Sequence, residues 1–115
     1  MSVPTPDPRF RTVSFEDWER LEGVKADAGK ARWDLIPFKA LQRTVEVLTY
    51  GAIKYAPENW RKVPDQRARY YAAALRHLVA WWGGERLDPE SGLPHLGHAS
   101  CCLMFLNEVE EEENA

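Results

Sequence analysis

The turn-rich segment GGERLDPESGLP, at residues 83–94, limits the fold more than any other feature of this sequence. Apolar side chains recur at helical intervals on both sides of it, over residues 66–82 before it and residues 94–110 after it. Asp65 is suited to cap the first of these helices, the glycine pair to end it, and Pro94 to open the second. Because consecutive elements usually lie next to each other, we expect the second helix to return alongside the first as a hairpin.

The remaining helical spacing predicts an all-α fold. A helix is expected from residue 37 to about residue 50, and the pattern allows it to continue through Tyr55, with Gly51 as a weak point. A shorter helix is expected within residues 14–23. Since no stretch alternates apolar and polar residues as a strand would, the sequence predicts a compact bundle of three to four main helices.

The length of the chain sets the expected domain organisation. A chain of 115 residues is long enough for one domain. We divide it into an extended proline-containing arm at residues 1–13, a single all-α domain at residues 14–110 and an acidic frayed tail at residues 111–115. Five tryptophans are many for a domain that buries a small share of its surface. We therefore expect an oligomer that covers exposed apolar area.

The charge balance narrows the classes of partner. A net charge of −3 and a pI near 5.6 argue against a protein that wraps a nucleic acid polymer, which needs a basic surface. A local group of Lys and Arg side chains still allows a small anionic ligand. No apolar stretch reaches the roughly 20 residues that span a bilayer, and the N-terminus lacks the apolar core of a signal peptide. No membrane partner is therefore expected.

The two cysteines, Cys101 and Cys102, are neighbours on the last predicted helix. Their side chains point about 100° apart on a helix, which argues against a disulfide between them. The lack of a disulfide framework suits a reducing compartment, so the expected location is the cytoplasm.

All three histidines fall on or beside apolar helical stripes. His95 and His98 lie one turn apart at the start of the last helix, and the hairpin brings them towards His77. The connecting segment adds three carboxylates, those of Glu85, Asp88 and Glu90. Imidazoles and carboxylates so placed can bind one divalent cation, and imidazoles can bind a phosphate. The alternatives are that each histidine is satisfied by a hydrogen bond in the core, and that the acidic residues serve the turns.

Three charged side chains within residues 37–55 are further candidates. Glu46 stands among apolar residues, where it either faces solvent or points inward as a metal ligand or general base. Lys54 lies near the same side if the helix continues, and together with Arg43 it could contact phosphate. The alternative is that both cations lie on the surface.

Two loop motifs suit the recognition of a nucleotide. In GKARWD, the alternate residues Lys30, Arg32 and Asp34 would share one side of an extended segment, where they could hold a polyanion and orient a base or sugar. Asn59 and Trp60 could supply an amide for base edges and a ring for stacking. Alternatively, Trp60 anchors its own loop.

Three long blocks of the sequence resemble one known family. They read GKARWDLIP, EVLTYGAIKYAPENW and AALRHLVAWWGGERLDPESGLPHLGHA, and the resemblance covers residues 29–106. They closely resemble the bacteriophage-associated family of dATP/dGTP diphosphohydrolase N-terminal domains. The resemblance implies hydrolysis of dGTP or dATP to the monophosphate and pyrophosphate. Some members are associated with phages that replace adenine by 2-aminoadenine, which implies a role in phage nucleotide metabolism within the host cytoplasm.

This family is similar in turn to the all-α MazG-type nucleotide pyrophosphohydrolases. Those proteins bind Mg²⁺ through four carboxylates, from an ExxE pair on one helix and an ExxD pair on the next. In this sequence HLGH falls where ExxD would be, so His95 and His98 replace the acids and His77 falls near the second glutamate. The resemblance implies a divalent metal, Mg²⁺ or Mn²⁺, and the imidazoles make Zn²⁺ an alternative. Because these relatives usually pair helices across a two-fold axis, the resemblance also implies a homodimer or homotetramer.

Each candidate residue has an expected role in that reaction. The metal ligands are expected among Glu46, His77, Asp88, His95 and His98, and the catalytic residues are Glu46, His77 and His98. Substrate binding is assigned to Lys30, Arg32, Asp34, Lys54, Asn59 and Trp60, with the cations on the phosphates and the last two on the base. Two other functions stay open: a non-catalytic nucleotide-binding module that depends on a partner, and a domain built around a structural zinc ion.

Overall fold

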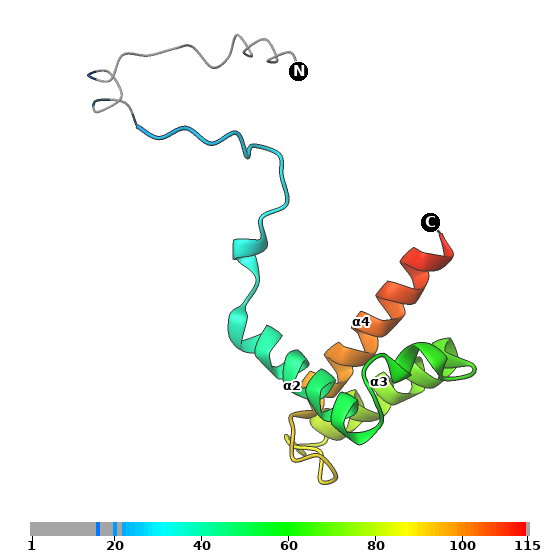
Figure 1. Cartoon of the computed structure of the whole chain (residues 1–115). Coiled ribbons are helices and arrows are strands. Elements are labelled where there is room, and N and C mark those ends of the chain that lie inside the picture. The colour runs from blue at the N-terminus through cyan, green and yellow to red at the C-terminus, as the bar shows by residue number, and fades with distance from the viewer. Residues whose placement is uncertain (1–15, 17–19, 21, 115) are drawn as a thin grey trace. The chain divides into compact units, whose positions relative to one another are not determined.

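The computed structural model describes residues 16, 20 and 22–114 and divides the chain into two units, Met1–Arg32 and Trp33–Ala115 (Figure 1). The expected arm at residues 1–13 lies outside the described residues. So does most of the helix expected within residues 14–23, of which the two described positions, Glu16 and Arg20, are helical. The boundary between the units falls inside the expected 14–110 domain, and the candidate site residues from Asp34 onward lie in the second unit.

The second unit is built from helices, which confirms the predicted all-α class. Its elements are η1 (Trp33–Leu35), α2 (Phe38–Lys54), η2 (Asn59–Lys62), α3 (Gln66–Trp82) and α4 (His95–Glu113), where η denotes a short 3-10 helix. Residues 22–114 form no strand, only an isolated bridge between Leu87 and Pro94 that closes the hairpin between α3 and α4. The three long helices match the number predicted from the apolar spacing.

The helix boundaries follow the local sequence, with two differences. Asp65 stands at the N-cap of α3 as expected, but it has a left-handed backbone and its side chain makes no capping hydrogen bond. The helix α4 continues to Glu113, so the expected frayed tail at residues 111–115 is helical over its first three residues. Two contacts explain this extension. Arg61 of η2 pairs with Glu112, and the Asn114 side chain donates to the Glu110 carbonyl at 2.8 Å.

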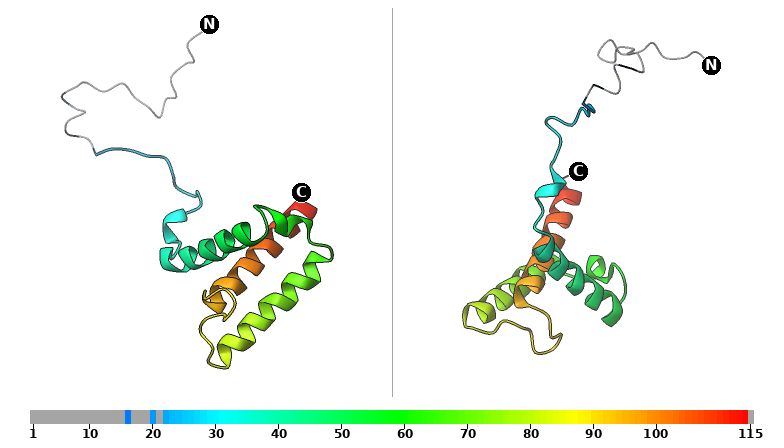
Figure 2. Two further views of the ribbon diagram at one scale, coloured as in Figure 1. Left: turned by 60° about the horizontal axis from the view of Figure 1, so that its bottom comes forward. Right: turned by 90° about the vertical axis from the view of Figure 1, so that its left-hand side faces the viewer.

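The helices α3 and α4 lie side by side and run in opposite directions, while α2 crosses α4 (Figures 1 and 2). Gly97 is buried at that crossing. A Cβ atom added to it would lie 3.1 Å from the carbonyl oxygen of Arg43 on α2, so a larger residue would push the two helices apart by a few tenths of an ångström. The crossing places the first turn of α4 beneath α2 and next to the end of α3, which is where the histidines meet.

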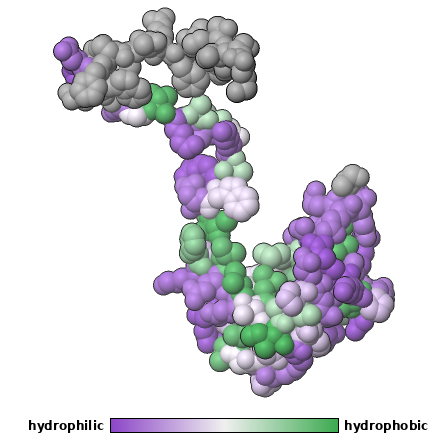
Figure 3. All heavy atoms as spheres, viewed as in Figure 1, coloured by the Kyte–Doolittle hydropathy of each residue, from purple (hydrophilic) through white to green (hydrophobic). Residues whose placement is uncertain are grey.

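The buried core is small, and several large apolar side chains stay exposed on α3. Trp82 is 83% exposed and Val79 is 70% exposed. Figure 3 shows hydrophobic patches on the helical unit beside the hydrophilic surface along the end of α4. Among the residues that the structure describes, no helix combines the length and the apolar character needed to cross a membrane.

Candidate functional site

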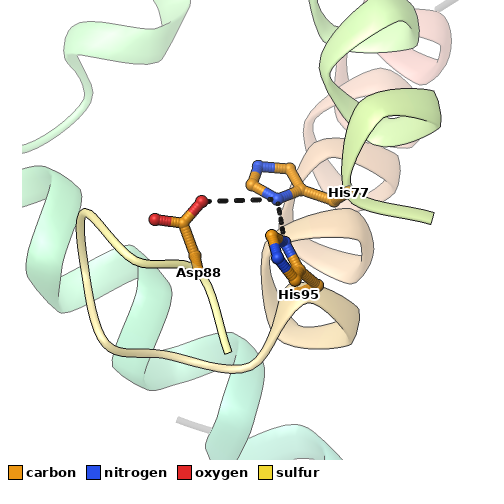
Figure 4. A group of neighbouring side chains, drawn as sticks. All are labelled: His77, Asp88 and His95. Atoms are coloured by element: carbon orange, nitrogen blue, oxygen red, sulfur yellow. Dashed lines mark hydrogen bonds and ion pairs between the residues drawn. The ribbon is translucent and has the colours of Figure 1, made fainter. Parts of the chain in front are cut away.

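His77, Asp88 and His95 meet where α3, the hairpin and α4 come together (Figure 4). The Nδ1 atoms of His77 and His95 lie 2.9 Å apart, and His77 Nδ1 is 3.8 Å from Asp88 Oδ2. One ligand atom from each of the three residues lies within 4.8 Å of the other two. His95 is only 3% exposed, whereas the other two are half-buried. His95 is therefore the buried member of the cluster, and His77 and Asp88 form the side that solvent can reach.

Asp88 serves the hairpin and the cluster at once. Its Oδ1 atom accepts the backbone N–H groups of Glu90 and Ser91, at 2.8 and 3.0 Å. Gly92 has a φ of +72° and donates its N–H to the Asp88 carbonyl at 2.7 Å, which closes the turn. The second carboxylate oxygen, Oδ2, is left to face His77. The turn interpretation and the site interpretation of this aspartate are thus compatible.

Glu85 determines the orientation and tautomer of His95. Its Oε1 atom lies 2.6 Å from His95 Nε2. Because a carboxylate can only accept, the His95 Nε2 carries the proton, and in the tautomer protonated at Nε2 alone the Nδ1 presents a lone pair towards His77. The same arrangement of carboxylate and imidazole orients many histidine ligands of metals.

The short distance between the two Nδ1 atoms has two chemical interpretations. Either His77 donates a proton to His95, or both lone pairs point at one cation. Two nitrogen ligands at about 2.1 Å from an ion and at right angles to each other would lie roughly 3 Å apart, which agrees with the 2.9 Å between these atoms. With the Asp88 oxygen beside them, the residues present fit a divalent ion that accepts mixed nitrogen and oxygen ligands.

His98 stands next to this cluster and is held by Ser91. The Ser91 Oγ atom lies 2.7 Å from His98 Nε2 and accepts the Leu93 N–H at 3.1 Å, and the tautomer of His98 sets the direction of its hydrogen bond with the hydroxyl. The His98 ring stacks on His77 with centroids 4.5 Å apart. His98 is therefore adjacent to the three-ligand group and separate from it, in a position to contact a bound anion.

The protonation states at the cluster suit a cation. Burial lowers the pKa of His77, and the neighbouring His98 lowers it further, against the opposing effect of Asp88. Burial likewise lowers the pKa of His98, with Asp88 opposing. Burial acting alone would raise the pKa of Asp88, but the amide donors from Ser91 and Glu90 outweigh it and lower the pKa. At neutral pH the two imidazoles are neutral and the aspartate is ionised.

A pocket of about 240 Å³ opens beside the cluster and is lined by His77, Asp88, His98 and Lys54. The Lys54 ammonium donates to Glu90, and this hydrogen bond is the main reason why the pKa of Lys54 is raised. Its Nζ also lies 5.2 Å from the centre of the Tyr55 ring. A permanent cation thus lies at the same pocket as the imidazoles, as expected for a phosphate contact.

Glu46 lies apart from this group. Its carboxylate accepts from the Gln42 amide at 3.3 Å and from Arg43 at 3.5 Å, and Glu46 does not line the pocket beside the histidines. Helical spacing placed Glu46 on α2 but could not decide which face would meet α4. Ser91 was missed because its role depends on how the hairpin closes, although the turn signal DPESG marked the segment.

The other predicted substrate residues are distributed as follows. Lys30 and Arg32 belong to the first unit and Asp34 to the second, and all three are exposed. Asp34 lies within the 3-10 helix η1, so the alternation that would place it on one side with Lys30 and Arg32 in an extended segment does not hold at this residue. Asn59 opens η2, and the Trp60 ring stacks on Phe105 with centroids 4.4 Å apart, so Trp60 anchors η2 to α4.

Comparison with known proteins identifies the family. The family described as dATP/dGTP diphosphohydrolase, N-terminal, matches residues 20–115. A protein of Salmonella phage PMBT28 named dATP/dGTP diphosphohydrolase is 34% identical over 86 residues, which are 75% of this chain and 29% of the relative. No solved structure matches the chain. The aligned region includes less than a third of the relative's length. The family match covers most of this chain, and the chain therefore belongs to the dATP/dGTP diphosphohydrolase N-terminal family.

Proposed function

We propose that this chain hydrolyses purine deoxynucleoside triphosphates, dGTP or dATP, to the monophosphate and pyrophosphate. The observation that carries the proposal is the meeting of His77, Asp88 and His95 beside a pocket that also holds Lys54. The name of the phage relative supplies the class of substrate. A role in the nucleotide pool of a phage, including one that uses 2-aminoadenine, would follow from that substrate.

His77, Asp88 and His95 would hold a divalent ion, with Mn²⁺ or Mg²⁺ as the expected metal and Zn²⁺ as the alternative. When bound, such an ion neutralises charge on phosphate oxygens and lowers the pKa of water. Glu85 contributes by holding the His95 ring in one orientation, with the lone pair of Nδ1 towards the ion. The mixed ligand set favours Mn²⁺ over Mg²⁺, because Mg²⁺ prefers oxygen ligands.

The remaining residues of the pocket would position the triphosphate and move a proton. The oxygen of a water molecule bonds to the α-phosphorus, the bond from that phosphorus to the bridging oxygen breaks, and pyrophosphate leaves. His98 is the base that we assign to the water, since its lowered pKa keeps the ring neutral. In the tautomer whose Nε2 donates to Ser91 Oγ, the Nδ1 lone pair is free to accept the proton. Lys54 would exchange Glu90 for a phosphate oxygen and stabilise the developing charge.

A product assay tests this proposal. The purified protein is incubated with each of dATP, dGTP, dCTP and dTTP in the presence of Mg²⁺, Mn²⁺ or Zn²⁺, and the products are separated by ion-exchange chromatography. We expect purine-selective release of monophosphate and pyrophosphate. Asp88→Asn should abolish turnover, whereas the matched control Glu110→Gln, on the exposed distal part of α4, should leave it unchanged. Release of nucleoside with tripolyphosphate would overturn the assigned bond.

A second candidate function is a nucleotide-binding module that works only with a partner domain. The specific observation in its favour is that the match covers 29% of the phage relative's length. In that case the protein should bind dGTP in calorimetry yet give no product with any of the three metals. Turnover by the isolated chain would exclude this candidate.

A further inference from the structure

A second and larger pocket lies next to the histidine pocket. It measures about 790 Å³, which is within the range of about 300–1,000 Å³ typical of small-molecule sites. Its walls include Trp60, Phe105 and Arg76. Arg76 immediately precedes His77, which lines the smaller pocket. The two pockets are therefore neighbours along α3.

The two pockets also meet on α2. The residues of α2 that line the larger pocket are Leu48, Gly51 and Ala52, and those that line the smaller one are Val47, Tyr50, Gly51 and Lys54. These two sets occupy adjacent faces of the helix, and Gly51 falls between them. Tyr55, which follows the end of α2, also lines both pockets. The two pockets therefore adjoin each other at Gly51 and Tyr55.

Gly51 has no structural reason to be glycine. It lies inside α2, where glycine is less favourable than alanine, and its backbone does not adopt a positive φ. A Cβ atom added there would meet nothing within 4 Å, so no neighbouring element needs the space. By contrast, Gly97 is required by the close approach of a backbone carbonyl. The empty space above Gly51 is the junction of the two pockets.

We propose that Gly51 is the point at which a nucleotide crosses α2, with its phosphates in the smaller pocket and its sugar and base in the larger one. The assignment of the ligand as a purine deoxynucleotide rests on the proposed function. The charge distribution supports this direction of binding. The Lys54 ammonium lies 5.9 Å from the centre of the Tyr50 ring and 5.2 Å from that of Tyr55, at the junction where the phosphate chain would pass.

The larger pocket has the chemistry that a purine base requires. Its α3 wall carries Ala72 and Ala73, whose small apolar side chains leave room for a base. Asn59 and Arg76 add an amide and a guanidinium that can bond to acceptors on the base edge. A base in this pocket would lie near Trp60, whose ring is already packed against Phe105. We therefore assign base-edge recognition to Arg76 and Asn59, while Trp60 holds η2 in place at the wall of the pocket.

Substitution at Gly51 tests the crossing, because stability and binding should change in opposite directions. Gly51→Ala should raise the melting temperature by about 2–5 °C through helix propensity. The same change should weaken the binding of a non-hydrolysable dGTP analogue by about tenfold, since a side chain there would crowd the ligand by 1–2 kcal/mol. A purely structural role of Gly51 would not weaken binding in a more stable protein.

Gly51→Leu should abolish binding of the analogue in calorimetry with Mn²⁺. Inorganic pyrophosphate should lose less affinity, because it occupies the smaller pocket alone and Gly51 is one of ten residues that line that pocket. Ala40→Leu is the matched control, because Ala40 lies on α2 away from both pockets. Binding of the analogue by Gly51→Leu with wild-type affinity would overturn the inference and leave the hydrolysis proposal intact. A wild type that binds pyrophosphate but not the analogue would also overturn it. Gly51-sensitive binding without any turnover would support the crossing and refute the proposed reaction.

Discussion

Replacing Glu85 by Gln should weaken metal binding without unfolding the protein. The His95 side chain is 4% exposed and depends on Glu85 for its orientation, through a contact of 2.6 Å. A Gln side chain retains an oxygen that can accept the Nε2 proton of His95, so the ring can stay in place. What is lost is the negative charge, which strengthens the hydrogen bond and makes the ring a better ligand.

The size of the effect follows from the geometry and from linkage. Loss of such a carboxylate typically costs about 10–100-fold in metal affinity, and we expect about tenfold here because solvent already competes for Glu85, which is 53% exposed. At a metal concentration about 100 times the wild-type Kd, binding adds about 2.7 kcal/mol to the free energy of unfolding. A tenfold weaker site adds about 1.4 kcal/mol under the same conditions. For a domain of this size these values correspond to shifts in Tm of about 11–22 °C and about 6–11 °C.

Thermal melts followed by circular dichroism, with and without Mn²⁺, measure both shifts. Metal-free wild type and Glu85→Gln should melt within a few degrees of each other, and Glu110→Gln serves as an exposed control with the wild-type response. An equal metal-induced shift in Glu85→Gln and in the wild type would refute the role of Glu85 in orienting a ligand. The absence of any shift in the wild type would mean that the Nδ1 atoms of His77 and His95 share a proton and hold no metal.

Three further predictions concern stability and assembly. Burial lowers the pKa of His77 and His98 from 6.5, so between the lowered values and pH 6.5 the unfolded chain binds more protons than the folded one. The free energy of unfolding should therefore be highest above pH 6.5 and fall as the pH drops through this window. Equal urea midpoints at pH 7.5 and 5.5 would contradict this expectation. Gly97→Val should destabilise the fold by about 1–3 kcal/mol, since the added side chain would collide with the Arg43 carbonyl, and a denaturant titration measures the loss. We propose that copies of the chain pair through the exposed face of α3, so light scattering should give a dimer or tetramer mass for the wild type and a smaller mass for Trp82→Glu, whereas a monomeric wild type would exclude this pairing.

The sequence predicts the helices well because their signals are local. The apolar spacing of residues 66–82 coincides with α3, and the turn residues after it lead to the hairpin that brings His77 next to His95 and His98. The end of α4 was misplaced because its last turns are held by Arg61, a residue far away in the sequence. A run of glutamates alone is typical of a frayed tail, but here the Arg61 guanidinium pairs with Glu112 and stabilises the last turn of α4.

The finer features of the site depend on contacts that a sequence does not display. Helical spacing puts Glu46 and Lys54 on one helix, but only the packing of α2 against the rest of the unit determines that Lys54 lines the histidine pocket and Glu46 does not. The pairing of Glu85 with His95 similarly depends on the path of the hairpin. Such contacts arise only after the helices have packed, so residue type and spacing cannot select among the available carboxylates.

Asp88 shows why turn signals and site signals should not be treated as competing explanations. Its Oδ1 atom accepts two backbone N–H groups of its own turn, and its Oδ2 atom lies 3.8 Å from His77. The donors that stabilise the turn also lower the pKa of the carboxyl group, which keeps the charge that a cation would need. The hydrogen bonds of the turn therefore hold the Asp88 carboxylate, in its ionised form, beside the imidazoles of His77 and His95. The same hairpin therefore connects α3 to α4 and places Asp88 next to His77 and His95.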